Sequence, residues 1–221
     1  MKRVLILVEG PTEARFVKDI LAPHLWERGV APTPTIVTTK KVKSGGSFKG
    51  GVYSFQKIEN DLRPLLADNG AALVTTMFDY YAFPKDFAGL KEVKAIKSTE
   101  RVAQLEGALE KYFDHKRLRA YLMLHEYEAM LFAEPPSIAA ALNEPLKASE
   151  LQEIRAQFAG PEEIDEGKET APSKRLMKLF ACYRKPLHGP LIVGRIGLPK
   201  VRQECPHFGE WLSDLEVLGE D

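Results

Sequence analysis

Three acidic residues each follow a hydrophobic segment with the composition of a buried strand. They are Glu9 after residues 4–8, Asp79 after residues 71–78, and Glu126 just after residues 119–124. Ligand sites in parallel sheets form beyond the carboxyl ends of the strands, so we expect these carboxylates to converge. One such acid alone is usually a helix cap or a loop residue. Three at strand ends predict a Mg²⁺ site, which Mn²⁺ could also fill, suited to phosphodiester cleavage.

The neighbours of these acids suggest supporting roles. Gly10 lets the backbone approach a phosphate closely. Glu13 lies about one helical turn after Glu9, where it could sit at the rim of the site or favour a helix N-terminus electrostatically. Glu128 is about 200° around a helix from Glu126, so we expect only one of the two to face the site. We predict that this one is Glu126.

Other residues near the predicted site have two interpretations. His125 could act as a general base, although a histidine at a strand end is more often structural. Tyr80, Tyr81 and Phe83 form an aromatic cluster that could stack nucleic-acid bases or pack over the sheet edge.

Basic residues are unevenly distributed along a chain with zero net charge. Residues 28–58 contain basic residues and no acid, and residues 170–203 contain eight basic residues and no acid. Within the second segment, Ser173, Lys174 and Arg175 follow Pro172, a pattern in which a helix N-terminus and two cations could bind phosphate. The alternative is a set of solvated helix faces.

Strand and helix patterns alternate through residues 1–135, which predicts an α/β fold with a mainly parallel sheet and flanking helices. The expected second strand is residues 35–39. The first expected helix is capped by Thr12 and has Phe16, Val17, Ile20 and Leu21 on one face, and the other expected helices of this part are 54–67, 99–113 and 126–132. Residues 136–221 show almost no strand pattern and predict a helical annex with helices at 149–158, 173–182 and 208–215. We expect the annex to pack on the core within one structural domain.

The segment Val8-Glu9-Gly10-Pro11-Thr12-Glu13 after a hydrophobic strand resembles the first motif of Toprim domains, which occur in topoisomerases, primases and overcoming-lysogenization-defect nucleases. Asp79 occupies the place of the second motif, Asp-x-Asp, but Tyr81 replaces its second aspartate. The resemblance implies a Toprim-like fold and a metal-dependent nuclease. It also implies that one metal ligand is missing unless Glu126, Glu128 or Asp86 substitutes.

Four further blocks are similar to a bacterial branch of Toprim-like proteins. They are residues 79–87, residues 125–129, Thr170-Ala171-Pro172-Ser173-Lys174-Arg175-Leu176, and Cys205-Pro206-His207-Phe208. The branch is similar to the nuclease effector of the PARIS phage-defence system. This resemblance implies cleavage of RNA such as tRNA, an ATPase partner protein and a role in antiviral defence. A homodimer is left open.

The composition limits the classes of protein to which the chain can belong. A 44% hydrophobic chain of 221 residues can bury an ordinary globular core. No apolar run approaches the roughly 20 residues of a membrane span, and only five apolar residues separate Arg3 from Glu9, so we expect a cytoplasmic protein without a signal sequence. Two cysteines predict neither a disulfide framework nor a zinc site. No nucleotide-binding loop is present.

Two alternatives to a nuclease remain at this stage. The first is a catalytically inactive subunit that binds nucleic acid or regulates a partner, which the tyrosine at position 81 favours. The second is a phosphohydrolase that acts on a small molecule.

Overall fold

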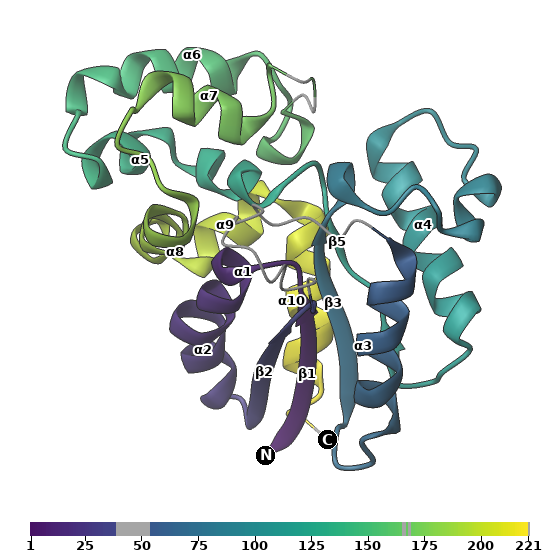
Figure 1. The fold of residues 1–221 in the computed structure, drawn as a ribbon. Helices are drawn as coiled ribbons and strands as arrows, with labels where there is room; N and C mark the ends of the chain where they lie inside the picture. Colours follow the sequence, from purple (N-terminus) through teal and green to yellow (C-terminus); the bar gives the residue numbers. More distant parts are fainter. Residues whose placement is uncertain (39–53, 165–166, 168, 221) are drawn as a thin grey trace, which may run out of the picture.

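The computed structural model describes residues 1–38, 54–164, 167 and 169–220. Its centre is a five-stranded sheet in which each strand pair is parallel, with the order β2-β1-β3-β4 and with β5 also paired to β3 (Figure 1). The strands are β1 (Lys2–Val8), β2 (Val30–Ile36), β3 (Leu73–Asp79), β4 (Leu118–Arg119) and β5 (Leu122–Met123). The predicted α/β class with a mainly parallel sheet is therefore confirmed.

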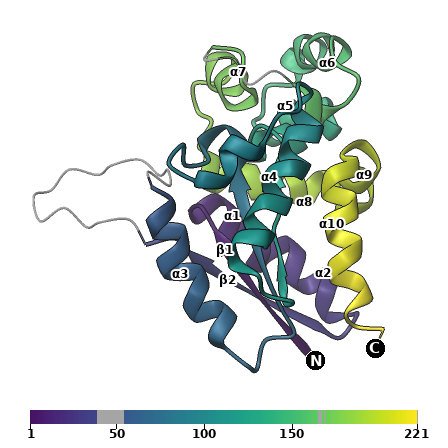
Figure 2. The ribbon, with the colours of Figure 1, turned by 90° about the vertical axis from the view of Figure 1, so that its right-hand side faces the viewer.

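Side chains of β1 alternate between two hydrophobic clusters, as the period of a strand requires. Val4, Ile6 and Val8 belong to one cluster, and Leu5 and Leu7 belong to the other. Helices α3 (Phe55–Ala67) and α4 (Ser98–Phe113) cover the second face (Figure 2). The first face is covered by a continuous helical segment, formed by α1 (Pro11–Phe16), the π-helical turn η1 (Val17–Leu21) and α2 (Ala22–Trp26), and by helices from the C-terminal part.

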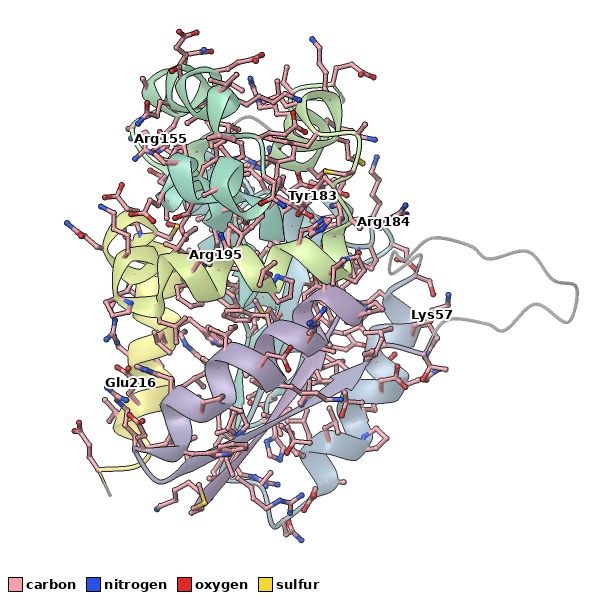
Figure 3. All side chains as sticks on the ribbon, turned by 90° about the vertical axis from the view of Figure 1, so that its left-hand side faces the viewer. Lys57, Arg155, Tyr183, Arg184, Arg195 and Glu216 are labelled. Carbon is pink, nitrogen blue, oxygen red and sulfur yellow. The ribbon has the colours of Figure 1, made fainter. Side chains whose placement is uncertain are left out.

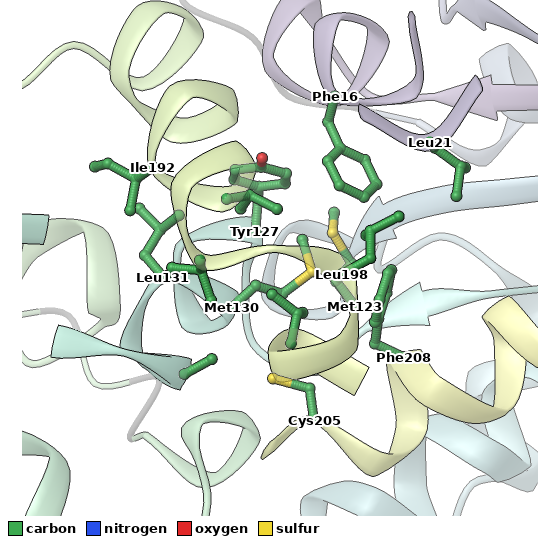
Figure 4. Packing of buried hydrophobic residues seen from close by; sticks show 14 of the residues in the cluster. Phe16, Leu21, Met123, Tyr127, Met130, Leu131, Ile192, Leu198, Cys205 and Phe208 are labelled. Carbon is green, nitrogen blue, oxygen red and sulfur yellow. The ribbon is translucent and has the colours of Figure 1, made fainter. Parts of the chain in front are cut away.

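Past β5 the described residues form helices and no strand. The α-helices of this part are α5 (Pro135–Ala141), α6 (Ala148–Ala156), α7 (Pro172–Leu179), α8 (Lys185–Ile196), α9 (Leu198–Glu204) and α10 (Pro206–Val217). They share one hydrophobic cluster with β1 and α1 (Figure 4). Trp211 of α10 also donates a hydrogen bond from Nε1 to Thr75 Oγ1 of β3 at 3.0 Å. The helical annex is thus confirmed as a C-terminal region, and its division from the core at residue 135 stays a prediction.

Three predicted elements differ in the structure. The second strand is residues 30–36 rather than 35–39, because Pro32 and Pro34 interrupt its strand pattern but are tolerated on the edge strand β2. The predicted strand 119–124 is divided into β4 and β5. Between them, the Tyr121 N–H donates to the side-chain Oγ1 of Thr76 on β3 at 2.9 Å instead of to a backbone carbonyl of that strand.

The third difference is the predicted helix 126–132, which begins one residue later and is the 3-10 helix η4 (Tyr127–Ala133).

Among the described residues, no helix combines the length and the apolar composition needed to cross a membrane. Basic residues of the predicted segment 28–58 that fall at positions 39–53 lie outside the described residues.

Candidate active site

Glu9 and Asp79 meet at the carboxyl edge of the sheet. Glu9 directly follows β1, and Asp79 is the last residue of the neighbouring strand β3. The Asp79 N–H donates to Glu9 Oε2 at 3.3 Å, so the backbone of one acid holds the carboxylate of the other. Asp79 Oδ1 in turn accepts from the Tyr127 N–H at 2.9 Å, which brings the residue after Glu126 to the same place. The structure thus brings Glu9 and Asp79 into contact and places the residue after Glu126 beside them, while the convergence of all three carboxylates on one ion stays a prediction.

A sharp backbone turn at His125 sets the position of Glu126. His125 is buried and has a φ of 63°, in the left-handed region that residues other than glycine rarely adopt. Its carbonyl accepts from the Tyr81 N–H at 3.3 Å, which joins the loop after β3 to the loop after β5. Glu126 follows with extended backbone angles, φ −157° and ψ 166°, immediately before η4. His125 therefore shapes the site through its backbone.

Lys185, a residue that the sequence analysis did not assign to the site, pairs with two of its acids. Its Nζ lies 2.9 Å from Glu128 Oε2 and 3.3 Å from Glu126 Oε2. The expectation that only one of these glutamates faces the site was wrong. It assumed that both belong to one α-helix, whereas Glu126 is extended and precedes η4, so the helical spacing does not apply to the pair.

Both glutamates also accept hydrogen bonds from the C-terminal region. The Ser173 N–H at the start of α7 donates to Glu126 Oε1, and the Tyr183 hydroxyl donates to Glu128 Oε1 at 3.1 Å. Every carboxylate oxygen of Glu126 and Glu128 therefore has a partner. These contacts make the helices after residue 135 part of the candidate site.

A close contact at Gly189 places α8 over the site. A Cβ at this position would lie 2.9 Å from Tyr127 Cε1 and 3.3 Å from Thr12 Cγ2, which is too close for a side chain. Glycine thus allows α8 to pack against η4 and α1, with Lys185 at its first position. The hydroxyl of Tyr127 is buried beneath this contact and has no hydrogen-bond partner among the described residues.

Burial and mutual repulsion raise the pKa values of the remaining acids. Burial, followed by the charge of Glu13, raises the pKa of Glu9 to about 7. Burial, followed by the charge of Glu128, raises the pKa of Glu13 to about 7. Burial and the charge of Glu9 hold the pKa of Asp79 well above its usual range. The folded state therefore favours the protonated forms of these three acids.

Lys185 has the opposite behaviour. Burial disfavours its ammonium form, but the carboxylates of Glu128 and Glu126 outweigh this effect and raise its pKa above the usual range. Lys185 is therefore protonated at neutral pH. One fixed positive charge partly compensates five neighbouring acids, which are Glu9, Glu13, Asp79, Glu126 and Glu128.

The donor set has the chemistry that Mg²⁺ or Mn²⁺ requires. No group of three or more histidine, cysteine or acidic side chains within the described ranges forms a ready metal shell. However, Mg²⁺ is usually held by one or two carboxylates, with waters and substrate phosphates completing its shell. Glu9 and Asp79 supply two carboxylates, and Glu9 Oε1 and Asp79 Oδ2 accept no hydrogen bond from the described residues. The residues present therefore fit this ion.

The predicted phosphate-binding residues are only partly placed at the site. The backbone of Ser173 contacts Glu126, and Lys174 follows it with an exposed side chain. Arg175 is engaged elsewhere, because its Nε donates to Thr170 O at 2.6 Å and its guanidinium lies 5.5 Å from the centre of the Phe158 ring. Gly10 lies against the acid cluster, where a Cβ would be 3.4 Å from Glu13 Oε2.

Two further candidate residues lie in the loop after β3. Asp86 accepts the Phe55 N–H through Oδ1 at 2.9 Å and so caps the start of α3. Tyr80 and Phe83 are buried, as the packing interpretation of the aromatic cluster expects, whereas Tyr81 is 50% exposed. Asp86 thus has a structural contact, and Tyr81 is the aromatic residue of this cluster that is open to solvent.

The fold and the site define an α/β protein with an acidic cluster at the carboxyl edge of a parallel sheet. The chain belongs to the family described as "Domain of unknown function (DUF4276)", whose model matches residues 8–216. Neither a curated protein nor a solved structure matches the chain. The likeness to Toprim domains stays a prediction.

Proposed function

We propose that this protein is a magnesium-dependent nuclease that cleaves a phosphodiester bond of a nucleic acid. The observation that carries the proposal is the contact between Glu9 and Asp79, two acids with raised pKa values that end neighbouring parallel strands. Hard oxygen ligands in this position suit Mg²⁺ and phosphate chemistry. The protein would meet its substrate in the cytoplasm.

Glu9 and Asp79 would hold the ion directly, and Glu126 is the third proposed ligand. When bound, Mg²⁺ would act as a Lewis acid toward the phosphate and lower the pKa of a water molecule. Lys185 fixes Glu126 and Glu128 and keeps a positive charge beside the site. The exposed Lys174 would attract the phosphate backbone. The proposed choice of RNA, an ATPase partner and a defence role depend on the resemblance described above.

A catalytically inactive binding or regulatory subunit is the second candidate. It is favoured by the pairing of Lys185 with two of the acids, since an internal cation reduces the need for a metal. In that case the chain would bind nucleic acid and leave it intact.

Cleavage assays separate these candidates. Purified protein would be incubated with tRNA or plasmid DNA over a series of Mg²⁺ concentrations and with a chelator, alongside Glu9→Gln and Glu27→Gln. Glu27 is an exposed acid at the end of α2, so its variant makes the same charge change away from the site. The proposal predicts cleavage that needs Mg²⁺ and is lost only in Glu9→Gln. Binding without cleavage supports the inactive subunit, and turnover of free nucleotides alone supports a small-molecule phosphohydrolase.

A further inference from the structure

Tyr81 presents an open aromatic ring beside the acidic cluster. It lies two residues after Asp79, and its N–H is held by the carbonyl of His125, the residue before Glu126. Half of its surface is exposed, whereas the neighbouring Tyr80 is 8% exposed. Burial raises the pKa of the Tyr81 hydroxyl, followed by the charge of Asp79, which is consistent with a ring close to this acid. A half-exposed aromatic residue thus lies next to the proposed metal ligands.

Arg184 adds a cation next to Lys185, the residue that contacts Glu126. It is exposed, and within the described ranges its guanidinium has no hydrogen-bond or ion-pair partner. Its backbone N–H donates to His188 Nδ1 at 2.9 Å at the start of α8. The next residue is Lys185, which contacts Glu126 and Glu128. Figure 3 shows Arg184 beside Tyr183 at this end of α8, with Arg195 at the other end.

We infer that the substrate is a single-stranded nucleic acid, with one unpaired base stacked on Tyr81 and an adjacent phosphate bound by Arg184. The inference rests on the proposed function and adds the class of substrate. An aromatic side chain can stack on the face of a base only where that face is uncovered, as in single strands and loops. The planar guanidinium of arginine matches the oxygens of a phosphate, and that of Arg184 pairs with no acid in the part of the chain that the structure describes.

Fluorescence anisotropy would test the stacking contact. The probes are a short labelled single-stranded RNA or DNA and the same sequence in a blunt duplex, measured with Glu9→Gln protein to prevent cleavage. We expect tighter binding of the single strand, and Tyr81→Ala should weaken it by about 10- to 100-fold. Tyr81→Phe, which keeps the ring, should stay within about twofold. Trp26→Ala is the matched control, because Trp26 is 53% exposed on α2 at the opposite end of the sheet.

The salt dependence of binding would test the phosphate contact. Arg184→Ala should lower the slope of log affinity against log salt by about 0.7, the value for one phosphate of a single strand. Arg195→Ala removes an equally exposed charge at the far end of the same helix and should leave the slope unchanged.

Two results would overturn the inference. One is duplex binding as tight as single-strand binding, and the other is an equal effect of Tyr81→Ala and Trp26→Ala. Failure of the proposed function has a different signature. A wild-type protein that binds single strands through Tyr81 but never cleaves them with Mg²⁺ would contradict the nuclease proposal and leave the binding inference standing.

Discussion

The Lys185 ammonium lies within 3.3 Å of carboxylate oxygens of both Glu126 and Glu128, so a residue of the C-terminal helices forms ion pairs with two buried acids that follow the sheet. The side chains of both glutamates are 1% exposed, and that of Lys185 is 33% exposed. Buried carboxylates of this kind depend on their partner, because a lone charge in the protein interior is strongly unfavourable. The stability of the fold therefore depends on the ion pairs that Lys185 makes with Glu126 and Glu128 in the candidate site.

Removing this cation should destabilise the protein. Lys185→Met leaves Glu126 and Glu128 without their ion pair, which should lower the free energy of unfolding by roughly 3 kcal/mol. Urea titration followed by circular dichroism would measure the change. Lys178→Met, at an exposed position on α7, is the control and should stay within about 0.5 kcal/mol of wild type. Adding Glu128→Gln to Lys185→Met should restore part of the stability, and equal losses for Lys185→Met and Lys178→Met would contradict the assigned role.

Glu9→Gln should abolish cleavage without unfolding the protein. The substitution removes a proposed metal ligand but keeps the size of the side chain and an oxygen that can accept the Asp79 N–H. It also removes one repelling charge from the cluster, so the melting temperature should equal or exceed that of wild type. Activity assays and thermal melts of the same preparation would test this. Loss of activity together with global unfolding would indicate a structural role for Glu9.

The advantage of Glu9→Gln in stability should depend on pH. The folded state raises the pKa of Glu9 from 4.5 to about 7, so it binds this proton more tightly than the unfolded chain does. In the wild type, the protonated Glu9 side chain stabilises the folded state. This contribution is fully present below pH 4.5 and is lost as the pH rises to about 7. Glutamine does not titrate. The variant should therefore gain on the order of 2 to 3 kcal/mol relative to wild type across this window, in the absence of metal.

Unfolding curves at pH 4.5, 6 and 8 would measure this difference. Glu27→Gln serves as the control, since the exposed carboxylate of Glu27 makes no contact with the cluster. Its free energy of unfolding should change with pH as that of wild type does. If the free energy of unfolding of Glu9→Gln also changed with pH as that of wild type does, Glu9 would not lie in a repulsive cluster.

Glu126 and Glu128 should differ in their effect on the need for magnesium. Both contact Lys185, but Glu126 directly precedes the residue whose N–H holds Asp79, whereas Glu128 is tied to the Tyr183 hydroxyl. We expect Glu126→Ala to raise the Mg²⁺ concentration for half-maximal cleavage more than Glu128→Ala does. Mg²⁺ titrations of the cleavage rate would decide, and the reverse order would assign the ligand role to Glu128.

The sequence predicted that Glu9 and Asp79 meet, because their placement depends on strand order and strand ends alone. Hydrophobic runs locate β1 and β3, and in a parallel sheet their carboxyl ends share one edge. The sequence alone therefore places Glu9 and Asp79 at the same edge. The helical spacing assumed between Glu126 and Glu128 was wrong, because Glu126 has an extended backbone and precedes η4.

Lys185 could not be predicted as a site residue from its local pattern. Its helix α8 contains Pro186, Gly189, Pro190 and Gly194, residues that normally indicate loops, so the sequence analysis expected no helix there. The only signal was its membership of a basic segment without acids. Its contact with Glu126 spans 59 positions along the chain and arises from the packing of α8 on η4, which local sequence does not encode.

A crystal structure of the protein soaked in Mn²⁺ would test the central claim most directly. Anomalous scattering locates the ion independently of any assay or substrate. The account predicts a peak bound by Glu9 and Asp79, with carboxylate oxygens at about 2.0–2.2 Å, and its absence in Glu9→Gln crystals soaked in the same way. A map with no peak at the carboxyl edge of β1 and β3, at Mn²⁺ concentrations that fill other surface sites, would contradict it.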